Sequence, residues 1–474
     1  MLLLRMLFNG RFFIKMNLRK FGLITLIAGL GTSVFGASID HIQNYTAEYN
    51  ANMAQQAAIS PTTSAYYNPA GIMRLENGTY FTGGVQLAFG KETMRYDTNA
   101  GEGNRYDANL LAPIPNFALI KKDDNRAYFW TFGGIAGGGD LKYEDGVAGI
   151  KVLEDGFGSI PTIGPLLKGA KDNGSWAEGE NMYAQTTLGT AWNINNKLSM
   201  SVAGRVVYGW RNLDAHLDAD IILDKDKLSH ITGKKIPTDI TLNDVTADIE
   251  AERTAWGFGG QIGLNYVAND TWNFAMRYDT KVKMEFEADT KSRPYTNKFV
   301  PGASLGFEMF FPQYADGAKY RRDLPAILAL GASQKVTDKW TMFYGANYYF
   351  NESAKIDKDV PGYSYGIEYD NGWEISLGTE YWLNEKWAVL GGVNYADTGA
   401  PKDSYSDVEF ALNSFLVGMG VKYRPNEDTE WVVSTSHYFY EATDGNFADK
   451  YPGANAQRYD KNISSIGFSY TKKF

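Results

Sequence analysis

The feature of this sequence that most restricts its fold is a set of short segments in which apolar and polar side chains alternate. In the clearest segment, residues 373–383, Trp373, Ile375 and Leu377 fall on one face, whereas Glu374 and Ser376 fall on the other. Successive side chains of a β-strand point to opposite faces, so each segment has one apolar and one polar face. Each is about ten residues long, which is the length that a tilted strand needs to cross a bilayer.

The alternating segments predict a barrel with an even number of strands. We expect fourteen strands, at 79–90, 110–121, 126–137, 182–194, 197–213, 249–266, 271–288, 324–336, 339–353, 371–383, 386–396, 412–424, 428–441 and 461–474.

The connections between these strands alternate between short and long. Short turns such as 194–196 and 268–270 are followed by long loops such as 214–248 and 289–323. A soluble β-sandwich has no reason to alternate in this way, whereas outer-membrane barrels combine short periplasmic turns with long extracellular loops. The sequence therefore predicts an all-β membrane protein, an antiparallel multi-pass β-barrel in a bacterial outer membrane.

The last predicted strand ends on Phe474, with Tyr470, Phe468 and Ile466 on the same face. An aromatic C-terminal strand of this kind resembles the signal that the barrel-insertion machinery recognises. A soluble edge strand that ends in Phe is the alternative. Closure is favoured because an unpaired strand edge in lipid leaves backbone groups without hydrogen-bond partners.

Composition excludes several classes of protein. The chain has no Cys, which rules out disulfide frameworks, thiolate metal sites and a Cys nucleophile. A net charge of −9 argues against a nucleic-acid partner. Beyond the N-terminus no apolar window is long enough for a membrane helix, and the mean hydropathy is −0.34.

The N-terminus has the pattern of a secretory signal peptide over residues 1–36, with Met16 as its true start. Arg19 and Lys20 precede an apolar run, and small residues suited to cleavage follow it. A membrane anchor is the alternative. Residues 37–76 then precede the barrel of residues 77–474, and periodicity alone allows them to be either a periplasmic tail or a plug in the lumen.

A run in this N-terminal segment resembles the hatch motif of the FadL/TodX outer-membrane transport proteins. It comprises Tyr66, Tyr67, Asn68, Pro69, Ala70 and Gly71. The likeness continues in residues 115–119, in residues 324–340 and in residues 372–387, which are similar to the family's second strand and two of its later hairpins.

The resemblance implies a fourteen-stranded barrel with a small N-terminal helical hatch in the lumen. Such a protein takes up hydrophobic compounds passively, most often long-chain fatty acids and also aromatic hydrocarbons, and releases them sideways into the membrane. The resemblance also implies that the extracellular loops capture the compound, that the hatch then rearranges, and that the compound leaves the barrel sideways beside a kinked third strand. We expect a monomer in contact with outer-membrane lipid, with no cofactor and no metal.

The third predicted strand ends in a glycine-rich run, which fits such a kink because glycine within a strand commonly marks a bend or bulge. The candidate exit residues are Gly133, Gly134, Gly137, Gly138 and Gly139. Simple narrowing of the wall by small residues is the alternative.

A fatty acid needs an apolar groove for its chain and a cation for its carboxylate. Two apolar loop stretches are candidates for the groove. They comprise Phe157, Ile160, Ile163, Leu166 and Leu167, and Phe307, Phe310 and Phe311. The alternative is that the two stretches pack on one another and cap the barrel. Alternation predicts lumen-facing cations on two strands: Arg205, Arg211, Arg277 and Lys281. Arg pairs well with carboxylates, but Glu374, Glu380 or Asp279 can compete for these cations.

No catalytic pattern stands out. The four His are scattered, and no nucleophile elbow, zinc-protease motif or phosphate-binding loop occurs. We therefore expect no enzyme. A general porin-like channel or a surface adhesin on the same barrel remains the alternative to uptake.

Overall fold

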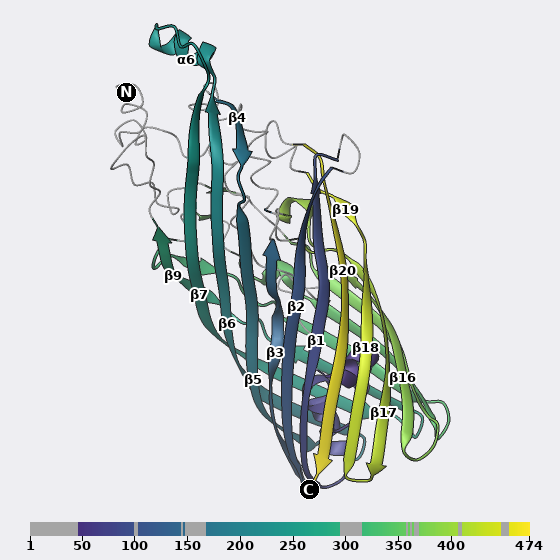
Figure 1. Cartoon of the computed structure of the whole chain (residues 1–474). Coiled ribbons are helices and arrows are strands. Elements are labelled where there is room, and N and C mark those ends of the chain that lie inside the picture. Colours follow the sequence, from purple (N-terminus) through teal and green to yellow (C-terminus); the bar gives the residue numbers. More distant parts are fainter. Residues whose placement is uncertain are drawn as a thin grey trace.

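The computed structural model describes residues 46–98, 103–143, 146, 167–293, 315–356, 359–360, 363–364, 369–405, 410–446 and 455–474. The strands form one antiparallel sheet that closes into a tilted barrel (Figure 1). The wall has fourteen crossings, because β8 and β9 together form one of them and β10 and β11 another. The predicted fold class and strand number are confirmed.

All strands of the wall, including the short ones, pair antiparallel with their neighbours. The wall strands are β1 (Gly78–Tyr96), β2 (Asn104–Lys122), β3 (Arg126–Tyr143), β5 (Trp176–Asn193), β6 (Leu198–Leu223), β7 (Ile240–Val267), β8 (Trp272–Asp279), β9 (Glu285–Arg293), β10 (Lys319–Arg321), β11 (Ile327–Lys335), β12 (Trp340–Tyr349), β15 (Gly372–Trp382), β16 (Trp387–Asp397), β17 (Ser414–Asn426), β18 (Thr429–Tyr440) and β20 (Gln457–Lys473).

Closure of the barrel depends on the C-terminal strand. β1 pairs with β20 in continuous register, from Tyr80 opposite Lys473 to Tyr96 opposite Gln457. The backbone N–H of Phe474 also donates to the carbonyl oxygen of Thr79, at 2.8 Å. No strand edge is therefore left at the point where the two ends of the wall meet, as lipid requires.

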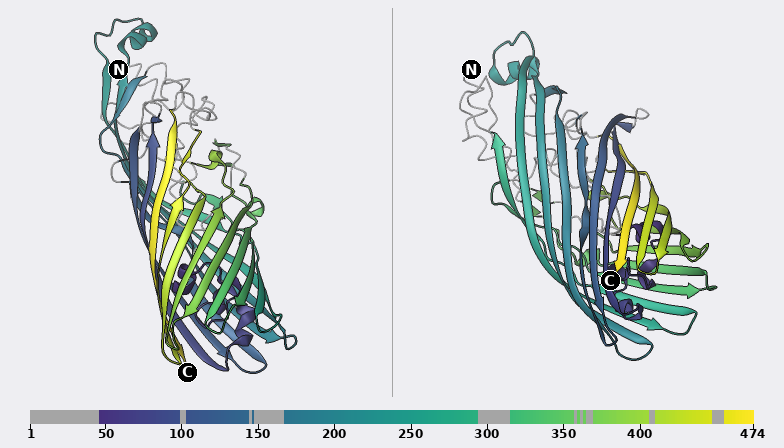
Figure 2. Two further views of the ribbon diagram at one scale, coloured as in Figure 1. Left: turned by 90° about the vertical axis from the view of Figure 1, so that its right-hand side faces the viewer. Right: turned by 60° about the horizontal axis from the view of Figure 1, so that its bottom comes forward.

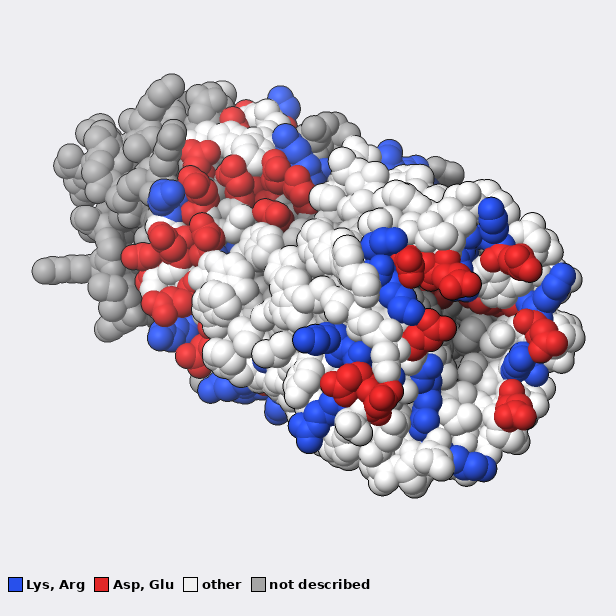
Figure 3. All heavy atoms as spheres, turned by 90° about the horizontal axis from the view of Figure 1, so that it is seen from below, with Lys and Arg blue, Asp and Glu red and all other residues white. Residues whose placement is uncertain are grey.

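Alternation divides the wall into a lumen face and a lipid face. On β2, for example, residues from Ala108 to Lys122 are alternately buried and exposed. The outer face carries large apolar side chains such as Leu188, Trp256 and Phe258, which are 63–70% exposed. Seen from below, a broad belt without charged side chains separates mixed charges at the near rim from an acidic region beyond it (Figure 3). This distribution matches a bilayer-spanning barrel.

The N-terminal segment lies inside the barrel, near the end with the short turns (Figures 1 and 2). It contains four short helical elements: α3 (Ala47–Ala51), η3 (Gln55–Ala57), α4 (Ser64–Tyr67) and η4 (Pro69–Arg74). We call residues 46–76 the hatch. Among the described residues, no helix has the length and apolar character that a membrane-spanning helix needs.

At the opposite end, β6 and β7 run far beyond their neighbours and form a long hairpin (Figure 1). They are 26 and 28 residues long, whereas a crossing needs roughly 10. Helix α6 (Lys225–Thr232) caps the hairpin, and β4 (Leu167–Asp172) pairs with the outer part of β6. The remaining small elements are η10 (Asn351–Ser353), β13 (Asp359–Val360), β14 (Tyr363–Ser364), η11 (Lys402–Ser404) and β19 (Thr443–Asp444).

Candidate transport site

The wall is interrupted between β2 and β3. These strands pair up to Asn116 opposite Gly133 and resume at Leu111 opposite Asp140, so residues 112–115 and 134–139 have no ladder partners across this seam. Pro113 and Pro115 lie in the unpaired part of β2, and proline has no backbone N–H to donate to a ladder. We call this interruption the β2–β3 gap.

Two bulges in β3 produce the gap. In its pairing with β5, β3 skips Ile135 and Gly138, so two extra residues accumulate on β3. Every residue from Gly133 to Gly139 is buried, which replaces the alternation seen on either side. The glycine-rich run predicted as a kink therefore lies at an irregular, bulged part of the wall.

Two of these glycines have backbone conformations that favour glycine. Gly137 has φ of +106° and Gly139 has φ of +73°. A methyl group on Gly137 would also clash with the carbonyl oxygen of Asn181, and one on Gly139 would stand 2.5 Å from Cβ of Ala112. On the lumen side, Ile114 and Ile135 are almost completely buried and fill the seam with apolar side chains.

The first half of the hatch, residues 47–57, lies in a groove of wall glycines. A methyl group on Gly331 would stand 2.6 Å from the backbone N of Ala57, and one on Gly420 would stand 2.8 Å from Cβ of Ala51. The other glycines that approach this stretch equally closely are Gly345, Gly378, Gly392, Gly418 and Gly467. Only glycine lets the hatch backbone come so close to the wall, so this half is fixed along β11 to β20.

The hatch motif holds the second half against the opposite wall. Asn68 Oδ1 accepts a hydrogen bond from the backbone N–H of Gly71, and its Nδ2 donates to Asn265 Oδ1 on β7 at 2.8 Å. Asn265 and Asn273 are hydrogen-bonded to each other, and Asn273 donates to the carbonyl oxygen of Ala57. Ser199 of β6 donates to the carbonyl oxygen of Ala70. The motif therefore docks the hatch on β6, β7 and β8.

Tyr66 connects the hatch to the edge of the β2–β3 gap. Its hydroxyl lies 2.6 Å from the carbonyl oxygen of Phe117 and 3.2 Å from that of Phe132, and these two residues are ladder partners next to the gap. Its own carbonyl oxygen accepts a hydrogen bond of 2.7 Å from Arg277 Nη1. Tyr66 was predicted only as part of the hatch motif. Its partners lie on other strands, and the sequence does not show which strands lie next to the hatch.

Arg277 and Arg205 line a small polar cavity beside Tyr66. Arg277 Nε lies 3.1 Å from Asp279 Oδ2, and Arg205 Nε donates to Gln185 Oε1 at 2.9 Å. Thr131 and Ile135 of β3 also line this cavity, whose volume is about 30 Å³. That volume holds a water molecule or two but not a ligand headgroup.

The other two predicted lumen cations differ from this pair. Arg211 is buried and faces inward, directly opposite Arg253 of β7, nearer the long hairpin. Lys281 is exposed, and its ammonium donates to the carbonyl oxygen of Ser353. The irregular stretch between β8 and β9 shifts the alternation by one residue, so Val282 faces the lumen. The expectation that Lys281 faces the lumen was therefore wrong.

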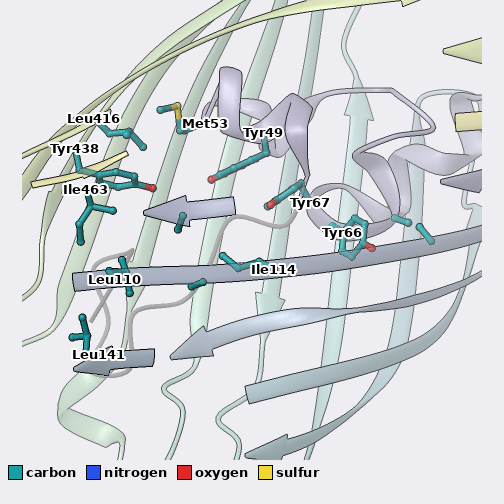
Figure 4. Packing of buried hydrophobic residues seen from close by; sticks show 14 of the residues in the cluster. Tyr49, Met53, Tyr66, Tyr67, Leu110, Ile114, Leu141, Leu416, Tyr438 and Ile463 are labelled. Atoms are coloured by element: carbon teal, nitrogen blue, oxygen red, sulfur yellow. The ribbon is translucent and has the colours of Figure 1, made fainter. Parts of the chain in front are cut away.

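An apolar patch of buried side chains joins the hatch to the inner face of the wall (Figure 4). The hatch contributes Tyr49, Met53 and Tyr67. The rings of Tyr49 and Tyr67 are stacked, with their centroids 3.9 Å apart. The wall residues of the patch come from five strands far apart in the sequence: Leu110, Ile114, Leu141, Leu416, Tyr438 and Ile463. None of these residues was among the predicted groove residues, because alternation shows which side chains face inward but not which of them meet.

The predicted apolar loop groove lies outside the described residues for seven of its eight members: Phe157, Ile160, Ile163, Leu166, Phe307, Phe310 and Phe311. The eighth, Leu167, begins β4, where its backbone pairs with Leu223. This part of the site stays a prediction.

A buried ion network ties the first half of the hatch to the wall. Lys422 Nζ lies 2.6 Å from Glu48 Oε1 and 2.7 Å from Glu380 Oε2. Arg424 pairs with Glu430 at 2.6 Å, and Glu430 also accepts a hydrogen bond from the hatch residue Thr62. Lys422 and Glu48 are buried almost completely, so loss of either partner leaves a charge inside the protein, which is strongly destabilising.

The chain matches a known protein family. Residues 170–474 match the model of the family described as outer membrane protein transport protein (OMPP1/FadL/TodX). The chain belongs to this family. The family description places these proteins in the outer membrane, so the predicted location is confirmed.

Similar proteins of the OMPP1/FadL/TodX family come from several bacteria. A long-chain fatty acid transport protein of Escherichia coli O6:H1 is 22% identical over 53% of this chain and 57% of its own length. Outer membrane protein P1 of Haemophilus influenzae is 24% identical over 50% of this chain and 52% of its own length. The chain thus spans somewhat over half the length of these two relatives.

A solved structure has the same fold over a longer stretch. The crystal structure of a Pseudomonas aeruginosa FadL homologue superposes with a TM-score of 0.64, at 15% identity, over 93% of this chain and 100% of that chain. At this identity the likeness establishes the barrel fold alone.

Proposed function

We propose that this protein takes up long-chain fatty acids, with capture at the extracellular loops, binding in the lumen, a limited shift of the hatch, and lateral exit through the β2–β3 gap. The observation that carries the proposal is the gap itself, an unpaired stretch of wall that apolar side chains fill. The passage is passive, because it follows the apolar surface from the lumen to the lipid.

The buried apolar patch supplies the surface that an acyl chain needs once the hatch shifts. Burial of each CH₂ group contributes roughly 0.8 kcal/mol, so a long chain binds without many hydrogen bonds. Ile114 belongs to this patch and also borders the gap. A chain bound on the patch is therefore already beside the exit.

The charges of the polar cavity favour a fatty acid over a neutral hydrocarbon. Two guanidinium groups, from Arg205 and Arg277, face a single carboxylate, from Asp279, which leaves one positive charge in excess. A ligand carboxylate balances this charge, and a bidentate Arg pair suits it. A hydrocarbon such as toluene offers nothing to these groups.

The hatch movement that this path requires is small. The 30 Å³ cavity is too small for a headgroup, so Tyr66 and its neighbours have to move aside. A carboxylate bound at Arg277 competes with the carbonyl oxygen of Tyr66 for the guanidinium. Since the same tyrosine bridges the two strands at the edge of the gap, binding is coupled to release of that edge.

The test compares two ligands in cells that produce Arg205→Gln and Arg277→Gln variants. We expect uptake of a fluorescent long-chain fatty acid to fall about tenfold or more, which corresponds to the loss of one charge-assisted contact of 1.5–3 kcal/mol. Uptake of a neutral aromatic such as radiolabelled naphthalene should stay near the wild-type rate.

The matched control is Lys281→Gln, which removes an exposed cation next to the same strand. It should leave both rates unchanged. If fatty-acid and naphthalene uptake fall together in the Arg variants while the barrel is folded, the carboxylate assignment is wrong.

A further inference from the structure

The tip of the long β6–β7 hairpin carries a basic cup. Helix α6 and the segment that returns from it enclose an open concavity of about 500 Å³. Its lining includes Lys225 at one end, Lys234 and Lys235 at the other, and His230 between them. With Asp226 as the only acidic residue of the lining, the cup has two positive charges in excess, although the whole chain has a net charge of −9.

The shape of the cup is fixed by local hydrogen bonds. Asp224 accepts hydrogen bonds from the backbone N–H groups of Asp226 and Lys227 and so caps the start of α6. Gly233, with φ of +66°, ends the helix. Ser229 Oγ accepts from the backbone N–H of Ile236 at 2.8 Å, which holds the returning segment against the helix.

The nearby carboxylates already have partners. Asp239 binds Lys168 Nζ at 2.5 Å and the backbone N–H of Lys225 at 3.0 Å. Hydrogen bonding by Lys168 lowers the pKa of Asp239, and the backbone N–H of Lys227 lowers the pKa of Asp224, so both stay ionised. In the described part of the chain, the ammonium groups of Lys225, Lys234 and Lys235 have no carboxylate within 4 Å.

The position of the cup exposes it to large partners outside the cell. Trp210 of β6 lies in the aromatic group with Tyr208 and Trp256 at the edge of the apolar belt. From there to Leu223 the strand rises roughly 40 Å, at about 3.3 Å per residue. The views of the whole molecule place α6 at the far end of this hairpin (Figures 1 and 2).

The wall below the tip has the opposite charge. Asp214 of β6 lies in register between Glu178 of β5 and Glu250 of β7. Lys142 pairs with Glu178 and Lys291 with Glu250, which leaves one negative charge in excess in this row. An anionic partner therefore meets net negative charge here and net positive charge at the tip.

We propose that the cup at the hairpin tip binds an acidic polysaccharide outside the cell. Lys225 is the first residue of α6, whereas Lys234 and Lys235 follow its end, and all three line the same open concavity, so a ligand with several anionic groups can contact them together. The lining has no aromatic side chain on which nucleic-acid bases could stack. A polymer with repeated sulfate or carboxylate groups fits both observations.

The strength of binding follows from the exposure of the lysines. An exposed ion pair contributes little to binding, so a single cup binds weakly and many copies on one cell surface bind by avidity. This inference is independent of the proposed uptake, since the tip is distant from the lumen.

The test uses the full-length protein in detergent on immobilised heparin, with neutral dextran as the reference surface. We expect salt-sensitive binding to heparin at low ionic strength and no binding to dextran. The triple variant Lys225→Glu, Lys234→Glu and Lys235→Glu should bind at least about tenfold more weakly, since three attractions become repulsions.

Two controls separate charge at the tip from other causes. A triple reversal of exposed lysines near the short turns, Lys121→Glu, Lys339→Glu and Lys386→Glu, changes the net charge equally and should keep binding within about twofold of wild type. Replacement of the three tip lysines by Arg should retain binding, which excludes misfolding of α6 as the cause. Equal losses in the two Glu variants, or wild-type binding by the tip variant, would overturn the proposal. Fatty-acid uptake should be unchanged throughout.

Discussion

At the scale of single residues, Tyr66 occupies the position where three parts of the site meet. Its hydroxyl contacts the carbonyl oxygens of Phe117 and Phe132 across the seam, and its carbonyl oxygen contacts Arg277. A single hydrogen bond of this kind contributes about 1 kcal/mol. Such a contact is strong enough to favour the closed edge of the gap and weak enough to be released by a bound ligand.

We predict that Tyr66→Phe raises the rate of fatty-acid uptake roughly threefold to fivefold. The ring stays in place, while the loss of about 1 kcal/mol makes opening of the seam more frequent. The measurement is initial uptake of a fluorescent fatty acid at equal surface abundance. Tyr80→Phe is the control, because its hydroxyl donates to the carbonyl oxygen of Glu76 away from the gap. An unchanged or lower rate in Tyr66→Phe would mean that the Tyr66 hydroxyl does not hold the edge of the gap closed.

At the scale of the element, β3 departs from regular strand structure over one short run. The bulges at Ile135 and Gly138 add two residues, and the positive φ of Gly137 and Gly139 allows the chain to turn inward. A regular strand here would pair with β2 along its whole length and close the wall. The gap is therefore built by the backbone of β3, with the prolines of β2 preventing a full ladder on the other side.

We predict that Gly137→Val abolishes most uptake, by about tenfold or more. A β-branched residue is strained at positive φ, and its Cβ would clash with the carbonyl oxygen of Asn181. The chain then has to give up the bulge. Gly204→Val on β6 is the matched control, since a Cβ there meets no atom within 4 Å. Both variants are checked for folded, heat-modifiable barrels by gel migration; normal uptake by a folded Gly137→Val barrel would show that exit does not use the gap.

At the scale of the whole molecule, the hatch is held differently on its two sides. Residues 47–57 lie in the glycine groove of β11 to β20 and are joined to the wall by the Glu48–Lys422 pair. Residues 64–74 hydrogen-bond to β6 and β7 and pack Ile72 and Met73 in the apolar core, but among the described residues no ion pair joins them to the wall. Movement is therefore easier in the second half, which is also the half beside the gap.

We predict that a covalent bond between the first half of the hatch and the wall leaves uptake intact. In Ala51→Cys with Gly420→Cys the two Cβ atoms stand 2.8 Å apart, closer than the roughly 3.5–4.5 Å of a disulfide, so the bond forms after a small shift of this stretch away from the wall. The chain has no other Cys to interfere. Uptake is compared before and after reduction with dithiothreitol, with each single Cys variant as a control. Uptake that is blocked when oxidised and restored when reduced would mean that the entire hatch has to leave the groove.

The sequence alone was sufficient for the strands, the closure by Phe474, the hatch motif and the glycine-rich part of β3. These features are local, because alternation, turn length and backbone freedom depend on neighbouring residues. The error at Lys281 has a local cause as well: one irregular stretch after Asp279 reverses the faces of the residues that follow in the same crossing, up to the end of β9.

Only the tertiary structure decided which distant residues meet. The partners of Tyr66 lie 51, 66 and 211 residues away along the chain, and the glycines of the groove belong to six strands. The alternation of apolar and polar residues shows which face of the strand each side chain occupies, but not the register in which neighbouring strands pair. Closure of the barrel sets that alignment, and with it the gap, the hatch contacts and the long hairpin that carries the basic cup.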